Sequence, residues 1–364
     1  MTVWYSVDAK LVEPVTMSSG NHSRNQAAAH PFLTGSALRG SLAARWLREQ
    51  HHVRSGRRPT PIGDRATHKQ FMNVFESGAV RFPFLYPPGP PPRLSLFECK
   101  ATPDHPAADL VDPRHPVGTK VTCRECASAL DRGVSGPDDR RRTHVRTRTA
   151  VGDDGVAAQA LLYAQEELSA GRLFSGIMAV DDDVDLTAWL PVGNEVALRL
   201  GADTSTGGTT NVLVTPQSVG PHATTPAARR EAWLAAGLAT DVVVLTARSP
   251  LVLTDRWLRP ADRFDHRILG DELGLTTVEL VPFTLARSRP AGGWNPAAGI
   301  PKPGDVSLVE GSVAQVRVKD DLSDPQVMAR LTQAEECGLG WRRAEGFGAV
   351  TLWSSIHLSE WRAP

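Results

Sequence analysis

The sequence predicts an α+β protein with two domains, each an antiparallel sheet with helices on one side. The chain has 364 residues, enough for two hydrophobic cores, and 41% of them are apolar. Strand-like alternation recurs along it and is interrupted by a few segments of helical periodicity. Each half begins with a strand and ends with a strand, a Gly-rich turn and a further strand. This repeated form indicates a divergent internal duplication.

The first predicted domain spans residues 1–215. Its opening segment, 3–12, alternates β-branched and aromatic residues as a half-buried strand does, and a polar loop is expected over 17–30. Apolar residues four positions apart predict an amphipathic helix from about 37 to 51, capped by Ser36. Further strands are predicted near 173–180, 195–200 and 211–214.

A long irregular segment interrupts this domain between about residues 86 and 149. It contains a Pro-rich start, three of the four cysteines and a basic run over 140–148. A loop of this length in a compact domain usually has its own stabiliser or its own function. We therefore expect an insertion with a separate structural element.

The second predicted domain spans 239–364 and follows a linker over 216–238. A Pro/Thr/Ala-rich stretch over 215–228 leads there into a short helical piece expected around Trp233. Strands are predicted at 242–247, 307–318 and 349–353, and a helix from about 325 to 337 that ends at Gly338. The turn over 338–348 contains four glycines, more than a hairpin turn needs: Gly338, Gly340, Gly346 and Gly348.

The charge balance conceals an asymmetry along the chain. Lys+Arg and Asp+Glu number 40 each, but residues 1–150 carry 22 basic and 13 acidic side chains, a net of +9, and the remainder has a net of −9. Such asymmetry is typical of proteins with a nucleic-acid or acidic partner, and equally of a basic and an acidic surface that face each other. No membrane span or signal peptide is visible, so a cytoplasmic location without membrane contact is expected.

The clustered cysteines predict a metal site in the insertion. Cys123 and Cys126 form a Cys-x-x-Cys pair, whose thiolates can converge on one ion, and Cys99 with His105 would complete a Cys3His structural zinc centre. His115 is the alternative fourth ligand. A redox pair and unrelated thiols are the competing interpretations, although the surrounding sequence lacks the strand-to-helix pattern of a thioredoxin-like motif.

Two segments are candidates for phosphate contact. Gly35 and Ser36 precede the predicted helix and Arg39 lies in its first turn, where free backbone N–H groups and the helix dipole favour anions. In the turn 338–348 the four glycines let a ligand approach the backbone, while Arg342 and Arg343 supply charge. No Gly-Lys-Ser/Thr follows the first segment, so nucleotide hydrolysis is not indicated.

These two segments carry a family resemblance. Residues 32–40, FLTGSALRG, and 338–348, GLGWRRAEGFG, resemble the helix start and the Gly-rich loop of the RAMP superfamily of CRISPR RNA-binding proteins. The cysteine-bearing segment 99–126, the stretch 146–176 and the segments 292–303 and 310–313 are similar to the subunit of type III-D complexes that caps the 5′ handle of the guide RNA.

The resemblance implies two ferredoxin-like (RRM-like) domains and a role in binding CRISPR RNA beside other RAMP subunits and a large polymerase-like subunit. It implies RNA contact by the glycines and arginines of both segments. Thr34 stands where the family has proline, and the first Gly-rich turn, 201–208, lacks the family's arginines.

Two other functions compete with a non-catalytic RNA-binding role. Some RAMP proteins are endoribonucleases with a histidine general base, for which His22 and His30 are the candidates here. Others cleave with an aspartate in the corresponding loop, but residues 17–30 contain no Asp or Glu. A zinc-stabilised protein-interaction module without RNA contact is the third possibility.

Overall fold

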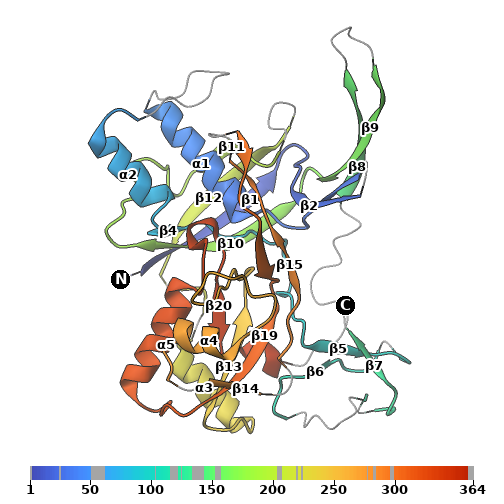
Figure 1. Cartoon of the computed structure of the whole chain (residues 1–364), viewed down its shortest axis with the longest axis vertical. Coiled ribbons are helices and arrows are strands. Elements are labelled where there is room, and N and C mark those ends of the chain that lie inside the picture. The colour runs from blue at the N-terminus through green and yellow to red at the C-terminus, as the bar shows by residue number, and fades with distance from the viewer. Residues whose placement is uncertain are drawn as a thin grey trace.

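The chain forms an α+β structure whose two halves lie one above the other (Figure 1). The computed structural model describes residues 2–23, 26–50, 62–102, 104–114, 122–123, 125–132, 143–151, 157–202, 207–218, 220–222, 224–276, 278–281, 284–295 and 299–359. The predicted α+β class is confirmed, and the described strand pairs are antiparallel except that of β3 with β9. None of the described helices is long and apolar enough to cross a membrane.

The first half is built on a five-stranded sheet of order β11-β12-β1-β10-β4. Its strands are β1 (Thr2–Leu11), β4 (Val80–Arg81), β10 (Leu173–Asp181), β11 (Glu195–Arg199) and β12 (Thr209–Gln217). Helices α1 (Gly35–Glu49) and α2 (Arg65–Phe75) pack against it (Figure 1). Helix α1 buries Leu38, Leu42 and Trp46, the residues whose four-residue spacing predicted it.

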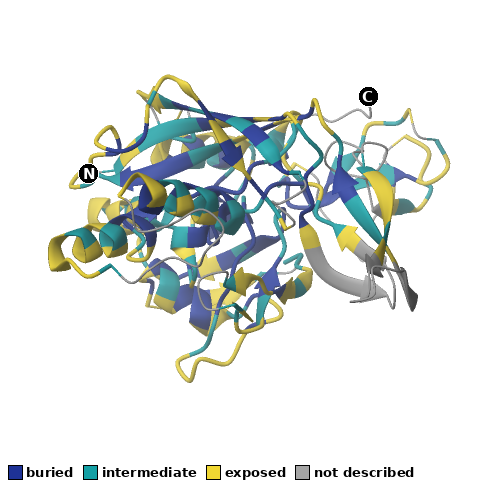
Figure 2. Cartoon of the chain, turned by 90° about the horizontal axis from the view of Figure 1, so that it is seen from above, coloured by how far each residue is buried: buried dark blue, intermediate teal, exposed yellow. Residues whose placement is uncertain are grey.

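The second half is built on a four-stranded sheet of order β14-β19-β13-β20. Its strands are β13 (Val242–Ala247), β14 (Val278–Leu280), β19 (Val313–Val318) and β20 (Val350–Leu352), with helices α3 (Pro226–Ala235), α4 (His266–Leu273) and α5 (Pro325–Cys337). All six residues of β13 are buried, which makes this strand the centre of the second core. Figure 2 shows the buried positions inside the molecule and the exposed ones on outer helix turns and loops.

Smaller sheets surround these two. One has the order β2-β3-β9-β8, and its hairpin of β8 and β9 projects from the first half (Figure 1). The insertion contributes a sheet of order β6-β5-β7, and two strand pairs, β15 with β18 and β16 with β17, belong to the second half. The bounds are β2 (Ser18–Ser23), β3 (Gln26–Ala29), β5 (Leu96–Cys99), β6 (Ala108–Asp109), β7 (Leu130–Arg132), β8 (Thr143–Val151), β9 (Ala157–Leu168), β15 (Ser288–Ala291), β16 (Trp294–Asn295), β17 (Ile300–Pro301) and β18 (Asp305–Leu308).

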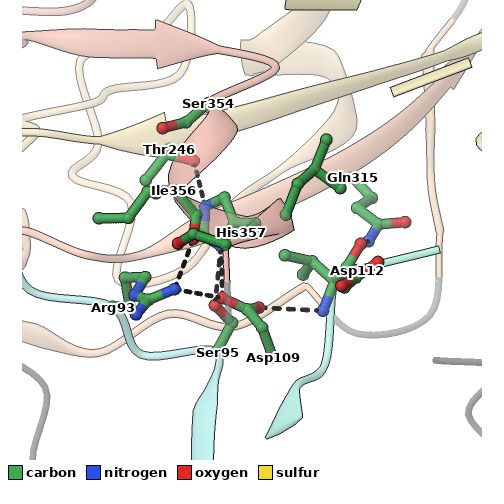
Figure 3. A network of polar contacts seen from close by, with 12 residues as sticks. Arg93, Ser95, Asp109, Asp112, Thr246, Gln315, Ser354, Ile356 and His357 are labelled. Carbon is green, nitrogen blue, oxygen red and sulfur yellow. Dashed lines mark hydrogen bonds and ion pairs between the residues drawn. The ribbon is translucent and has the colours of Figure 1, made fainter. Parts of the chain in front are cut away.

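The insertion interrupts the first half in sequence but packs on the second half in space. Figure 3 shows the buried contacts that fasten it: Asp109 accepts from His357 Nδ1 at 2.8 Å and from Arg93 at 3.4 Å, and His357 Nε2 lies 2.8 Å from the Thr246 hydroxyl in β13. Arg93 also donates to the Ile356 carbonyl at 2.6 Å. His357 is fully buried in the 3-10 helix η3 (Ser355–Leu358), so this network has no access to solvent.

Several expected elements differ from the structure. Residues 17–30 contain strands β2 and β3 instead of a loop, and α1 begins at Gly35 with Thr34, not Ser36, as its cap: the Thr34 hydroxyl accepts from Ala37 N at 3.3 Å. The expected strand 307–318 is two strands, because Gly311 turns the chain between them with a φ of +81°. By contrast, the short helical piece expected around Trp233 is confirmed as α3, in which Trp233 is fully buried.

Candidate nucleic-acid interface and metal cluster

The two segments singled out in the sequence meet in space. The Gly-rich loop, residues 338–348, contains the 3-10 helix η2 (Arg343–Glu345), which contacts the start of α1 and strand β4. A Cβ atom on Gly35 would lie 2.2 Å from the Phe82 carbonyl oxygen and 2.3 Å from that of Glu345. A Cβ atom on Gly346, at a φ of +83°, would lie 2.2 Å from the same Phe82 oxygen. These glycines therefore allow three backbone segments to touch.

Glu345 is the electrostatic centre of this junction. It is buried, and its carboxylate accepts from Lys302 Nζ at 2.7 Å and from Arg342 at 2.7 Å, while Arg39 lies 3.8 Å away. Burial raises the pKa of Glu345, but Arg342 and Lys302 outweigh it and the net pKa is lowered. One carboxylate thus links α1, the Gly-rich loop and the segment after β17.

The three predicted phosphate-binding arginines differ in their surroundings. Arg39 donates to the Phe75 carbonyl at 2.6 Å and pairs with Glu76 at 2.9 Å. Arg342 donates to the Ala291 and Gly292 carbonyls, pairs with Asp305 at 3.2 Å and stacks over the Phe347 ring. Arg343 is exposed, and its side chain makes no hydrogen bond or ion pair among the described residues. Of the three, it is the arginine whose guanidinium is not held by other groups of the described chain.

The remaining predicted contact residues are divided between the surface and the junction. Gly338 has a φ of +75° and ends α5, as predicted, while Gly340 and Gly348 have φ values of +73° and +90° against neighbouring backbone. The Ser36 hydroxyl lies 3.2 Å from that of Thr34. Gly338, Arg343 and Gly346 line the cavity between the halves, whereas Gly35, Ser36 and Arg39 are not part of its wall.

A cavity of about 810 Å³ separates the two halves beside the Gly-rich loop. Strands β1 and β10 of the first half, the Pro-rich segment 87–92 and the end of β13 all contribute to its wall. An aromatic cluster closes it on one side, where Phe84 meets Phe347 edge to face with ring centroids 5.1 Å apart. This volume is within the range of small-molecule sites, about 300–1,000 Å³.

The cavity contains a charged cluster that the sequence analysis missed. Arg248 directly follows β13 and lines the cavity; its side chain makes no hydrogen bond and no ion pair within 4 Å among the described residues. Nearby, Arg229 binds Glu335 through two contacts of 2.7 and 2.5 Å. Burial, followed by Arg248 and Arg229, lowers the pKa of His222 to about 3. The sequence signal for Arg248 was only a basic residue at the end of an apolar strand.

The four predicted metal ligands converge at the insertion. The ligand atoms of Cys99, His105, Cys123 and Cys126 all lie within 4.8 Å of one another. Cys99 Sγ is 3.4 Å from Cys126 Sγ, and Cys123 Sγ is 3.3 Å from His105 Nδ1. A tetrahedral ion with Zn–S bonds of about 2.3 Å needs sulfurs about 3.8 Å apart, so the cluster fits such an ion. His115, the alternative ligand, lies outside the described residues.

The surroundings of this cluster favour the thiolate at Cys126 and Cys123 but not at Cys99. Hydrogen bonds from Ser128, followed by Cys99, lower the pKa of Cys126 to about 6, backbone hydrogen bonds lower the pKa of Cys123, and burial raises the pKa of Cys99. His105 directs Nδ1 at Cys123, and its Nε2 lies 3.7 Å from the Glu125 carboxylate. A carboxylate on the second ring nitrogen commonly orients a metal-bound histidine. The set can therefore hold one tetrahedral metal ion.

The other predicted candidates contribute less. His30 stacks on Phe32 with centroids 4.8 Å apart, and burial, followed by Arg289, lowers its pKa to about 4. The side chain of His22 and residues 140–142 of the basic run lie outside the described part. In the first Gly-rich turn, residues 203–206 lie outside it as well, and Gly201 and Gly208 pack against backbone.

Comparison with known proteins gives architectural similarities only. No family model and no curated protein match the sequence. A chain of the type III-B Cmr-beta complex bound to cognate target RNA aligns at 12% identity over 92% of this chain and 95% of its own, with a TM-score of 0.44. Cas6 in a product complex aligns at 12% identity over 97% and 99%, with a TM-score of 0.40. Cmr4 from Pyrococcus furiosus aligns at 11% identity over 59% and 98%, with a TM-score of 0.27. These values carry no functional argument.

Proposed function

We propose that this chain is a non-catalytic CRISPR RNA-binding subunit of a type III interference complex and that it holds the 5′ handle of the guide RNA. The observation that carries the proposal is the meeting of the helix start at Gly35 with the Gly-rich loop 338–348. These are the two segments that resemble RAMP motifs, and they lie about 300 residues apart in the sequence.

The order of elements supports the ferredoxin-like part of the proposal. The helices of the second half and the strands of its four-stranded sheet follow one another as β13, α4, β14, β19, α5, β20, which is the β-α-β-β-α-β sequence of that fold, with the two strand pairs β15–β18 and β16–β17 inserted between β14 and β19. Four strands of the first half, in the order β12-β1-β10-β4, repeat the arrangement β20-β13-β19-β14 of the second. The insertion then separates β4 from β10, the hairpin pair of the first half.

The exposed side chains around the loop suit single-stranded RNA. Arg343 supplies a free guanidinium, and the rings of Trp341 and Trp294 are 54% and 59% exposed. Single-stranded RNA is commonly held by stacking on such rings and by arginine contacts to phosphate. Arg39 and Arg342 act differently in this proposal: they position the loop through Glu345.

The proposal omits RNA cleavage because His30, one of the two candidate general bases, is poorly suited to it. A general base works best with a pKa near the operating pH. The pKa of His30 is about 4, and its ring is stacked on Phe32. We assign the metal cluster to one structural zinc ion that stabilises the insertion, with all four positions filled by protein. Other RAMP subunits and the large polymerase-like subunit are the proposed partners.

The test compares Arg343→Ala with Arg330→Ala, an exposed arginine on α5 away from the loop. Binding of a labelled repeat-derived RNA to the full chain is measured at several salt concentrations. We expect Arg343→Ala to weaken binding about 5- to 20-fold and to reduce the salt dependence, as removal of a phosphate contact does. Equal affinity of the two variants would refute the contact. Cleavage of the RNA that is lost in His22→Ala would refute the non-catalytic role.

A further inference from the structure

The cavity between the halves contains an arginine without a partner. Arg248 is fixed through its backbone, since its N–H donates to the Ala349 carbonyl at 2.8 Å. Burial lowers the pKa of Arg248, whereas Glu335 and Tyr86 raise it. A guanidinium remains charged in proteins even when its pKa falls somewhat. A half-buried charge without an ion pair is costly, and such a group is commonly kept to bind a ligand.

The charges near Arg248 leave an excess of one positive charge. Arg229 and Arg248 both act on Glu335, the carboxylate near them. That carboxylate already accepts two contacts from Arg229 and one from the Leu352 N–H at 2.7 Å. His222 is neutral at pH 7, because its pKa of about 3 is far below that pH. The cluster thus presents a net positive group to the cavity.

The other acidic residues of the wall do not cancel this charge. Glu310 is held by Arg289 through contacts of 3.3 and 2.7 Å. Asp8 and Glu336 are exposed. Of the other arginines that line the cavity, Arg81 pairs with Asp181 at 3.1 Å and Arg343 is exposed. Among the described residues of the wall, Arg248 is therefore the half-buried cation that is available to a ligand.

Part of the wall is apolar and offers flat surfaces. Trp4, Phe84, Tyr86 and the segment 87–92, which has five prolines, line the cavity. A volume of about 810 Å³ is far more than a bare anion fills. Aromatic rings and prolines provide surfaces on which a planar base packs.

We propose that this cavity binds one nucleotide unit, with its phosphate on the guanidinium of Arg248 and its base against the aromatic and proline wall. The unit can be a free nucleotide or part of an RNA chain, since both present the same phosphate and base. Arg343 and other residues of the loop 338–348 line the same cavity, but the proposed phosphate contact is made by Arg248, so variants of Arg248 test it independently of Arg343→Ala.

The experiment uses the full chain and four versions of it: wild type, Arg248→Gln, Arg248→Lys and the control Arg330→Gln. Calorimetry measures binding of AMP, of adenosine and of a short single-stranded RNA, and thermal melting is recorded with and without AMP. We expect wild type to bind AMP at least about 10-fold more tightly than adenosine. Arg248→Gln should weaken the affinity for AMP about 10- to 100-fold. Arg248→Lys should weaken it less, and the control should bind AMP as tightly as wild type does.

Melting separates binding from folding. Without ligand, Arg248→Gln should melt no lower than wild type, because the side chain of Arg248 has no hydrogen bond or ion pair to lose among the described residues. AMP should raise the melting temperature of wild type and of the control Arg330→Gln, but not that of Arg248→Gln. If Arg248→Gln loses AMP binding and keeps RNA binding, the site takes a free nucleotide. If it loses RNA binding, whether or not AMP binding is also lost, the site takes a nucleotide of an RNA chain. Unchanged binding of both would overturn the proposal. A lower melting temperature that Arg248→Lys fails to restore would also overturn it.

Discussion

Removal of the Glu345 charge should destabilise the junction between the halves. Glu345→Gln keeps the size and one acceptor oxygen but leaves Lys302 and Arg342, each 2.7 Å from a carboxylate oxygen, without their anion. Their side chains are only 17% and 14% exposed, so water compensates little. Breaking one partner out of a buried ion pair costs about 3–5 kcal/mol, and the remaining amide acceptor favours the lower end, about 3 kcal/mol.

Thermal melting checks this estimate. At about 2–4 °C per kcal/mol for a unit of 150–250 residues, a loss of about 3 kcal/mol lowers the melting temperature by about 6–12 °C. Glu231→Gln, an exposed carboxylate on α3, is the matched control and should change it by about 1 °C at most. A Glu345→Gln protein with the same melting temperature as the control would refute the reasoning.

The same prediction has a pH signature. The pKa of Glu345 in the folded chain is below its ordinary value of 4.5. The stabilisation is therefore fully present above about pH 4.5 and is lost as the pH falls through the folded pKa. Wild type and Glu345→Gln should differ most at neutral pH and converge in acid. A difference that is constant with pH would contradict the ion-pair explanation.

The remaining predictions concern the metal cluster, the helix start and the insertion. Elemental analysis should find about one zinc per chain in wild type and much less in Cys123→Ser; wild type without zinc would rule out the assignment. Gly35→Ala should destabilise the fold, because its Cβ would lie 2.2 Å from a carbonyl oxygen, whereas Gly40→Ala in the same helix has open space and should stabilise it by up to about 1 kcal/mol; equal melting of the two would exclude the close contact. Asp109→Asn should cost on the order of 3 kcal/mol in urea unfolding and expose the insertion to protease, since it weakens the buried contact with His357; unchanged protease resistance would show that the network does not hold the insertion.

The sequence predicted those elements in which buried apolar residues recur at a regular spacing or whose ends carry a clear signal. The four-residue spacing of Leu38, Leu42 and Trp46 predicted α1, and the Pro and Gly at the ends of 325–338 predicted α5. Helix α4, with eight residues, is too short to show a clear period, and β2 and β3 are polar strands. Tertiary pairing with β9 explains why these polar strands form where local propensity favours a loop.

The residues of the candidate site could be predicted from the sequence, but the contacts between them in the folded chain could not. The spacing of Cys123 and Cys126 predicted a metal-binding pair, and Cys99 with His105 was the expected completion, with His115 as the alternative ligand. Gly35 and Gly346 were singled out, but their contact with the Phe82 carbonyl depends on how the two halves pack. Packing within the first half pairs Arg39 with Glu76, packing within the second half pairs Arg342 with Asp305, and the side chain of Arg248 is left without a described partner. No local pattern encodes which arginine is left without a partner.

Photo-crosslinking of a repeat-derived guide RNA to the full chain, followed by peptide mapping, tests the RNA-binding account most directly. The account predicts crosslinks in the Gly-rich loop 338–348, above all at the exposed Trp341 beside Arg343. Crosslinks confined to the insertion, or none above those of a scrambled RNA, would contradict it.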